Sequence, residues 1–199
     1  GKIESVLTDK GEMKAKIFVG AAGAYTREVA KWAGVDIPTR PVKHEIIATE
    51  PIKFFQEPML VGIPSGIYFS QSLRGEIVGG IGDPVEFEGY NINTTVDFLK
   101  HFSREITKMI PSLKYVKIMR QWAGLYDMSP DVKPILSGTS VENFYVACGY
   151  SGHGLMISPM VGRLMSQLIL GHPTDLDMKS FSLDRFKEGK LEIETTKIG

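Results

Sequence analysis

The stretch from Phe144 to Gly171 constrains the fold of this chain most strongly, because it joins three structural patterns. It begins with the apolar run FYVAC, which is typical of a buried strand. A turn with Gly149, Gly152 and Gly154 comes next. Apolar residues then recur at helical spacing up to the stop signals Gly171 and Pro173, namely Val161, Leu164, Met165, Leu168 and Ile169. The stretch therefore predicts a strand, a glycine-rich turn and a helix.

The pattern alone leaves two interpretations of this turn open. Glycines admit positive φ and let a ligand approach the backbone, where the unpaired N–H groups of a helix start favour negative charge. Glycine-rich turns are equally common as tight connections that bind nothing. The two interpretations have about equal weight at this point.

The same order of elements is predicted near the N-terminus. Residues 3–7 and 15–19 have the character of strands, and a turn around Gly11 makes them a hairpin. The second strand leads through Ala22 and Gly23 into a helix that Gly34 ends, with Tyr25, Val29, Trp32 and Ala33 at helical spacing. The small residues of this turn either contact a ligand or let the helix pack on the sheet.

A second unit is expected to begin after the prolines of IPTRP, residues 37–41. Residues 44–49, 66–70 and 76–80 read as strands of an antiparallel sheet, in which Tyr68 and Phe69 face opposite sides. Thr94 or Thr95 caps a helix that ends at Pro111 and carries an apolar stripe of Val96, Leu99, Phe102, Ile106, Met109 and Ile110. Residues 115–126 form a long strand candidate.

The charge balance limits the kinds of partner to expect, and the cysteine content indicates the cellular compartment. The 23 basic and 23 acidic side chains balance, which argues against a nucleic-acid footprint or a basic membrane surface. The single cysteine, Cys148, lies in an apolar run, as a buried and unreactive thiol in a reducing compartment would. No apolar run is long enough to span a bilayer, and no signal peptide opens the chain. We expect a cytoplasmic protein with small-molecule or protein partners and no metal site.

Three blocks together resemble one family. They are IFVGAAGAYTREVAKWAG, WAGLYDMSPDVKPILSG and FYVACGYSGHGLMISPMVGRLMSQLI. In matching order they are similar to the C-terminal portion of D-amino-acid oxidase-like FAD-dependent oxidoreductases, especially glycine oxidase, the sarcosine oxidase beta subunit and dye-linked proline dehydrogenase. The resemblance covers residues 3–186 and is far more specific than a single glycine motif.

The resemblance implies an α+β chain in two parts. Residues 39–121 would form the substrate domain, an antiparallel or mixed sheet with flanking helices. Residues 1–38 and 122–186 would be the C-terminal part of the FAD-binding α/β domain. The high charge of residues 187–199 separately predicts a loosely attached tail, with a short edge strand at LEIETTKI. The turn at Ala22 and Gly23 would lie against the adenosine-diphosphate half of FAD, and the turn 149–156 against the flavin. The residues implied in cofactor binding are Ala22, Gly23, Gly124, Leu125, Gly149, Ser151, Gly152, His153, Gly154, Leu155 and Met156.

Several positions depart from the family pattern. No G-x-G-x-x-G motif occurs between a strand and a helix, so we expect the nucleotide-binding half to be missing, through truncation or presence on another chain. Met156 stands where monomeric sarcosine oxidases have a substrate-binding lysine, and Gly124 where they have the cysteine that links the flavin. Tyr126 stands where D-amino-acid and glycine oxidases have a carboxylate-binding arginine. The implied FAD is therefore non-covalent.

Two hypotheses of function follow. In the first, the full-length protein oxidises the C–N bond of a small amine or amino acid by hydride transfer to FAD, with Tyr68 and Tyr126 lining the substrate site. The catalytic residue is unassigned, and His153 is expected to shape its loop. In the second, the chain is a non-catalytic subunit or scaffold. The missing half or a partner subunit would cover an apolar face, or the chain would cover it as a homo-oligomer, and the chain alone is expected to bind FAD weakly.

Overall fold

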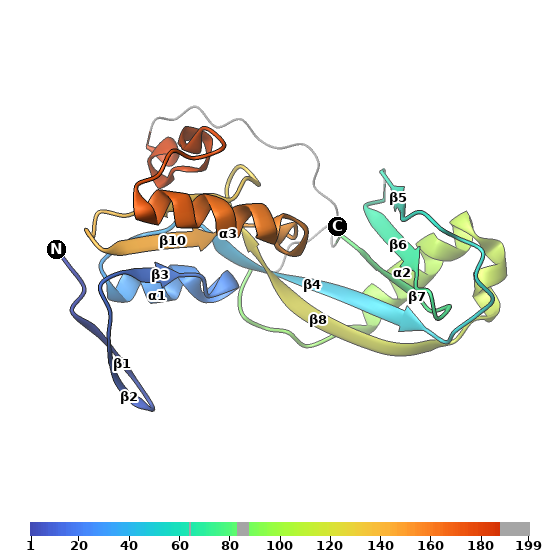
Figure 1. Ribbon diagram of the computed structural model, residues 1–199. Coiled ribbons are helices and arrows are strands. Elements are labelled where there is room, and N and C mark those ends of the chain that lie inside the picture. Colours follow the sequence, from blue (N-terminus) through green and yellow to red (C-terminus); the bar gives the residue numbers. More distant parts are fainter. Residues whose placement is uncertain (64, 83–87, 188–199) are drawn as a thin grey trace. The chain divides into compact units, whose positions relative to one another are not determined.

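The computed structural model describes residues 1–63, 65–82 and 88–187 (Figure 1). The edge strand expected at LEIETTKI lies outside the described residues. Within the described residues the chain forms two compact units, one of residues 1–41 and 126–187, the other of residues 42–125. Each unit has a hydrophobic core of its own.

The first unit is built on a three-stranded sheet in the order β3, β10, β9. β3 (Phe18–Gly20) runs parallel to β10 (Phe144–Cys148), and β9 (Ile135–Gly138) runs antiparallel to it. Gly20 lies opposite Val146 in this register. Since parallel strands end at the same edge of a sheet, the turns that follow β3 and β10 emerge side by side.

A hairpin precedes this sheet, with β1 (Ser5–Thr8) paired to β2 (Gly11–Lys14). The expected pairing of residues 3–7 with 15–19 is therefore wrong, although Phe18 and Val19 do lie in a strand. Thr8 pairs directly with Gly11, so the turn contains only two residues and β2 begins sooner than the apolar pattern suggested. Phe18–Gly20 instead pairs with β10.

Helices cover both faces of the three-stranded sheet. Val146 and Cys148 of β10 pack with Ala30 of α1 (Thr26–Trp32), whereas Ala147, which alternates with them, packs with α3 (Gly154–Leu170) (Figure 1). The predicted apolar stripe of α3 is confirmed: Leu164 and Met165 are buried, and Val161, Leu168 and Ile169 pack against them. Two 3-10 helices, Met178–Phe181 and Leu183–Phe186, follow α3 and contact β9.

The helix expected between Gly23 and Gly34 is confirmed, but its apolar residues are buried only in part, with Ala33 packed against the core. Its buried residues are Thr26 and Ala30, while Tyr25 and Trp32 are 52% and 81% exposed. The small Ala30 side chain lets the helix lie close to the sheet, and this places the aromatic side chains outside the core.

The second unit contains a five-stranded sheet in the order β5, β6, β7, β4, β8. The pairs β6–β7 and β7–β4 are antiparallel, as the sequence predicted, and β5, which the sequence analysis did not predict, pairs antiparallel with β6. The strands are β4 (Arg40–Thr49), β5 (Leu60–Gly62), β6 (Ile67–Gln71), β7 (Ile77–Ile81) and β8 (Ile118–Met128). The chain combines antiparallel and mixed sheets with helices and so belongs to the α+β class, which confirms the predicted fold class.

One helix covers one face of the five-stranded sheet. α2 (Val96–Met109) starts at Thr95, whose hydroxyl accepts a hydrogen bond from the Phe98 N–H, and a 3-10 helix Pro111–Tyr115 follows. The buried residues of α2 are Phe98, Phe102 and Ile106, spaced four apart, and they pack on the sheet with Ile47, Ile67, Phe69, Ile77 and Ile81. Val96 and Met109, expected in the stripe, are instead largely exposed because they lie off this four-residue row.

A buried carboxylate ties α2 to the sheet. Glu45 forms an ion pair with Lys43 Nζ at 3.0 Å and accepts hydrogen bonds from the Thr95 N–H (2.7 Å), the Thr95 hydroxyl (2.8 Å) and Gln121 Nε2 (2.9 Å). Burial alone would raise the pKa of Glu45, but these partners hold it below the ordinary value. The helix start is thus fixed to β4 and β8 by one charged group.

Candidate functional site

The turn between β10 and α3 has the backbone conformation that its glycines allow. φ is +71° at Gly149 and +94° at Gly152, and Ser151, with φ +51°, lies in the left-handed region as well. A Cβ at Gly149 would lie 3.1 Å from Ser129 Cβ and 3.3 Å from Thr39 Cγ2. Glycine is therefore needed at this position both for φ and for space.

Asp127, at the end of β8, holds this turn. The Gly149 N–H donates to Asp127 Oδ2 at 2.6 Å, and the Ser151 N–H donates to the Asp127 backbone oxygen at 2.9 Å. The side chain is buried, and this burial raises the pKa of Asp127, an effect that the hydrogen bond from the Gly149 N–H only partly offsets. Its Oδ1 has no hydrogen-bond partner in the described part of the chain. Asp127 thus fixes the two N–H groups that open the turn.

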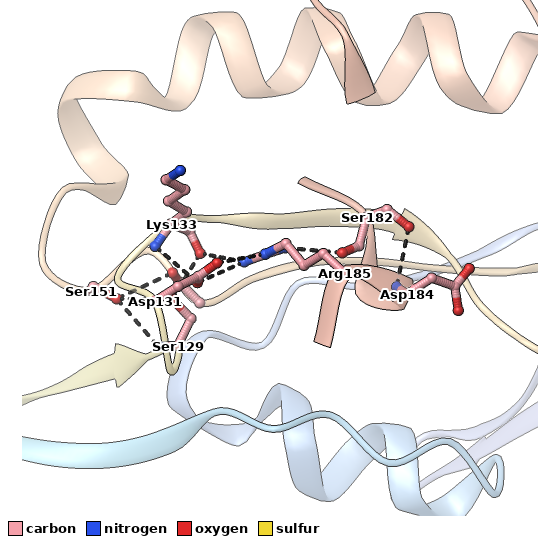
Figure 2. A network of polar contacts seen from close by, with 8 residues as sticks. Ser129, Asp131, Lys133, Ser151, Ser182, Asp184 and Arg185 are labelled. Atoms are coloured by element: carbon pink, nitrogen blue, oxygen red, sulfur yellow. Dashed lines mark hydrogen bonds and ion pairs between the residues drawn. The ribbon is translucent and has the colours of Figure 1, made fainter. Parts of the chain in front are cut away.

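A network of hydrogen bonds joins the turn to the loop that follows β8 (Figure 2). The Ser151 hydroxyl accepts a hydrogen bond from the Ser129 N–H at 3.2 Å and donates to the Gly149 oxygen at 3.3 Å. The Ser129 hydroxyl donates to the Lys133 oxygen at 2.8 Å, so the turn joins the loop that follows β8. Ser151 is 2% exposed, so its side chain faces the protein interior.

Arg185 closes the same network. Its Nε and Nη2 donate to the two oxygens of Asp131 at 2.7 and 2.9 Å, and Nη2 also donates to the Lys133 oxygen at 2.9 Å (Figure 2). Burial alone would raise the pKa of Asp131, but Arg185 holds it below the ordinary value. Val132, which lies between Asp131 and Lys133, has φ +64°, and this is uncommon for a β-branched residue. The arginine therefore imposes the shape of the loop 129–133.

The start of α3 offers free backbone donors. Within residues 149–156 of the described structure, the N–H groups of Gly149, Ser151 and His153 have backbone or side-chain acceptors, and His153 supplies no side-chain cap. The first helical N–H groups, at Gly154, Leu155 and Met156, have no acceptor inside a helix. Leu155 and Met156 are 92% and 69% exposed. Free donors beside exposed apolar side chains suit a flat, partly anionic ring system.

Tyr126 lies against this turn. A Cβ at Gly152 would come within 2.8 Å of Tyr126 Cε2 and 2.9 Å of its Cζ. The structure thus brings together two residues predicted for different roles, Tyr126 for substrate and Gly152 for cofactor. The ring can approach the backbone only because position 152 has no side chain.

We expect Gly152→Ala to destabilise the protein by about 1–3 kcal/mol, because alanine is strained at φ +94° and its methyl group would displace the Tyr126 ring. Urea unfolding measures this change. Gly162→Ala in α3 is the matched control: nothing lies within 4 Å of a Cβ there, so helix propensity should make it neutral or stabilising by up to about 1 kcal/mol. Equal stability of the two variants would contradict the strained turn.

The second predicted turn lies at the same sheet edge. Ala22 precedes the 3-10 helix Gly23–Tyr25, and Gly23 has φ +55° with nothing within 4 Å of a Cβ. Its small residues therefore leave open space at the end of β3, beside the end of β10. This arrangement fits a ligand that extends along the edge.

The other predicted residues belong to the second unit. Gly124 and Leu125 lie on β8, and a Cβ at Gly124 would have nothing within 4 Å. Tyr68 lies on β6, where its hydroxyl is 2.8 Å from His44 Nε2. Tyr68, Gly124 and Leu125 thus share the second unit.

Sequence reasoning missed Asp127, Ser129 and His44. A charged residue inside the apolar strand pattern of β8 was the available signal for Asp127, since a buried carboxylate requires partners. The expectation for Cys148 is confirmed: the thiol is buried, and burial raises its pKa. Over residues 1–63, 65–82 and 88–187, no cluster of three potential metal ligands occurs, and no helix is long and apolar enough to cross a bilayer.

Comparison with known proteins gives one family match. The family model described as "DAO: FAD dependent oxidoreductase" matches residues 1–168. This match confirms the resemblance that the three sequence blocks carried.

Curated relatives agree with it. The chain is 32% identical over 188 residues to the hydrogen cyanide synthase subunit HcnC of Pseudomonas protegens, covering 93% of the chain and 44% of that protein. It is 30% identical over 200 residues to the sarcosine oxidase subunit beta of Rhodobacter capsulatus, covering 100% of the chain and 48% of that protein. The chain thus spans about half the length of the curated relatives it matches.

A solved structure has the same fold. L-proline dehydrogenase from P. horikoshii superimposes with a TM-score of 0.90 at 37% identity, over 96% of this chain and 52% of that one. The arrangement of turns and sheets described above is therefore that of a known flavoenzyme fold.

Proposed function

Because this chain belongs to the DAO family of FAD dependent oxidoreductases, we propose that it is part of a longer flavoenzyme that oxidises the C–N bond of a small amine or amino acid. The observation that carries the proposal is the pair of turns at one sheet edge, after β3 and after β10. Bound FAD supplies the acceptor for the hydride.

The residues of the first unit fit the cofactor. Ala22 and Gly23 leave the open space that the adenosine-diphosphate half needs, and Gly152 leaves room at the turn of α3. The N–H groups of Gly154, Leu155 and Met156 would donate to the electron-rich edge of the ring. Asp127 and Ser151 keep the turn in shape from behind, so their role is to position these donors.

The substrate would lie against Tyr126, which packs on the turn at Gly152. Tyr68, on β6 of the second unit, remains a sequence-based candidate. In this proposal the second unit is the substrate domain, and Gly124, which has no thiol, leaves the cofactor non-covalent. The exposed Leu155 and Met156 would help to exclude water, which hydride transfer requires.

We expect the full-length protein to purify with a flavin absorbance that bleaches anaerobically with one of sarcosine, proline, glycine or dimethylglycine. The 199-residue chain alone should bind FAD weakly, because the pyrophosphate-binding motif is not among its residues. Absence of flavin absorbance and of amine-dependent bleaching in the full-length protein would refute the proposal. Tight stoichiometric FAD on the 199-residue chain would refute the second expectation.

A second candidate is a non-catalytic subunit. An apolar hollow of about 500 Å³ lies beside β3 and is lined by residues that include Leu7, Val19 and Trp32, which are 81%, 46% and 81% exposed. Such a surface suits a further domain or a partner subunit, and HcnC and the sarcosine oxidase protein are themselves named as subunits. A strand–G-x-G-x-x-G–helix in the coding sequence just upstream of Gly1 would favour the flavoenzyme over this candidate.

A further inference from the structure

Asp127 places a carboxylate in the protein interior at the turn that precedes α3. Its side chain is buried, Oδ2 accepts the Gly149 N–H at 2.6 Å, and its backbone oxygen accepts the Ser151 N–H at 2.9 Å. Oδ1 has no hydrogen-bond partner among the described residues. The Thr39 hydroxyl, whose Cγ2 would lie 3.3 Å from a Cβ at Gly149, is likewise buried without a partner. One carboxylate oxygen thus holds the turn, and the other is left for a proton.

The titratable and charged neighbours of Asp127 do not compensate its charge. Burial raises the pKa of the Cys148 thiol and raises the pKa of Tyr150 to about 12, so both side chains are neutral at physiological pH. The guanidinium of Arg185 is held by the carboxylate of Asp131. In the part of the chain that the structure describes, no lysine, arginine or histidine contributes to the pKa of Asp127, and its burial favours the neutral form.

The proposed function places a second negative charge at this turn. The N–H groups of Gly154, Leu155 and Met156 would donate to the edge of the flavin, which becomes electron-rich on reduction. Asp127 binds N–H groups a few residues earlier in the same turn. Like charges repel each other strongly in the protein interior. Reduction of the flavin and ionisation of Asp127 therefore oppose each other, and the effect is reciprocal.

We propose that Asp127 takes up a proton from solvent when the flavin bound at this turn is reduced. The C–H bond of the amine breaks, and its hydride carries two electrons and one proton to the flavin. A second proton, from water, bonds to Asp127 Oδ1, so that one negative charge disappears as another forms on the ring. Oδ2 keeps the Gly149 N–H, and the turn stays fixed. The inference rests on the proposed function, and it makes Asp127 a positioning residue that acts on the flavin through the turn.

Potentiometric titration of the full-length flavoprotein at several pH values tests this proton uptake. At a fixed potential, the ratio of reduced to oxidised flavin falls about tenfold per pH unit when one proton accompanies the electrons, and about a hundredfold when two do. We expect Asp127→Asn to lose the steeper dependence, although its amide oxygen still accepts the Gly149 N–H. At the alkaline end this variant should hold at least about tenfold more reduced flavin, which is a shift of about 30 mV for a two-electron couple.

Two further variants locate the proton. Asp184→Asn removes a carboxylate that is 70% exposed, and as the matched control it should follow the curve of the unaltered protein. His153→Gln removes the histidine of the turn and should keep the steeper dependence. An infrared difference spectrum of the unaltered protein needs no variant: reduction should add the carbonyl band of a protonated carboxyl group.

The outcomes separate this inference from the proposed function. Identical curves for Asp127→Asn and the unaltered protein, or an infrared spectrum without the carboxyl band, overturn the proton uptake. Loss of the steeper dependence in His153→Gln but not in Asp127→Asn assigns the proton to the histidine and overturns the role of Asp127. A full-length protein without flavin absorbance refutes the proposed function and this inference with it, whereas bound flavin with an unchanged curve refutes the inference alone.

Discussion

Asp131→Ala is expected to lower the free energy of unfolding by about 3–5 kcal/mol, because it leaves the buried guanidinium of Arg185 without its carboxylate. The side chains of the pair are only 2% and 10% exposed, so water cannot replace the lost partner. Desolvation makes the net contribution of such a pair small, whereas removing one member is costly. Urea unfolding measures the loss.

Asp184→Ala is the control for this variant. Asp184 pairs with Lys187 at 2.7 Å, but the two side chains are 70% and 79% exposed, so its removal should leave the urea midpoint almost unchanged. If Asp131→Ala changed the urea midpoint as little as Asp184→Ala, the ion pair between Asp131 and Arg185 would not be what holds the loop 129–133. A large loss would also be expected to loosen the turn 149–156, since Ser129 and Ser151 join it to the same loop.

Glu45→Gln is expected to destabilise the second unit by an amount on the order of 3 kcal/mol. The change removes the charge that pairs with Lys43, and the side chains of both residues are less than 10% exposed. It also weakens the acceptor that holds Thr95 at the start of α2. Asp97→Asn, whose side chain is 93% exposed, is the control and should change the urea midpoint little.

The pH dependence of this effect has a definite sign. The pKa of Glu45 is lower in the folded protein than its ordinary value of 4.5, so the folded state favours the ionised form. The stabilisation is therefore fully present above about pH 4.5 and is lost as the pH falls through the lowered folded value. Glu45→Gln should unfold with a flatter acid limb than the unaltered protein. An unchanged limb would show that Glu45 does not carry this part of the acid sensitivity.

Local patterns predicted much of the fold. Helical spacing gave the buried stripe of α3, proline and a capping threonine gave the ends of α2, and alternation gave the antiparallel sheet. The errors arose where a local pattern competed with packing. The apolar residues 15–19 looked like the partner of residues 3–7, but a two-residue turn closed the hairpin earlier and left Phe18–Gly20 for β10.

The candidate site was predictable only in part. The glycine turn could be located because glycine has a conformational signature that sequence retains. The groups that support it could not, because Asp127 is 22 residues from Gly149 and Arg185 is 54 residues from Asp131. The His44–Tyr68 contact depends further on strand order, since only β7 between β6 and β4 places a glycine beneath both side chains. No local pattern encodes such distances.

The hydrogen bonds of Arg185 to Asp131 and Lys133 hold the residue between them, Val132, in a strained backbone conformation. A residue held in a sparsely populated backbone region stores about 1–3 kcal/mol, and here the residue is β-branched and lies between two positions that Arg185 grips. Glycine or asparagine would adopt φ +64° with little penalty. Replacing Val132 by glycine or asparagine should therefore raise the stability of the protein without altering the groups that shape the turn.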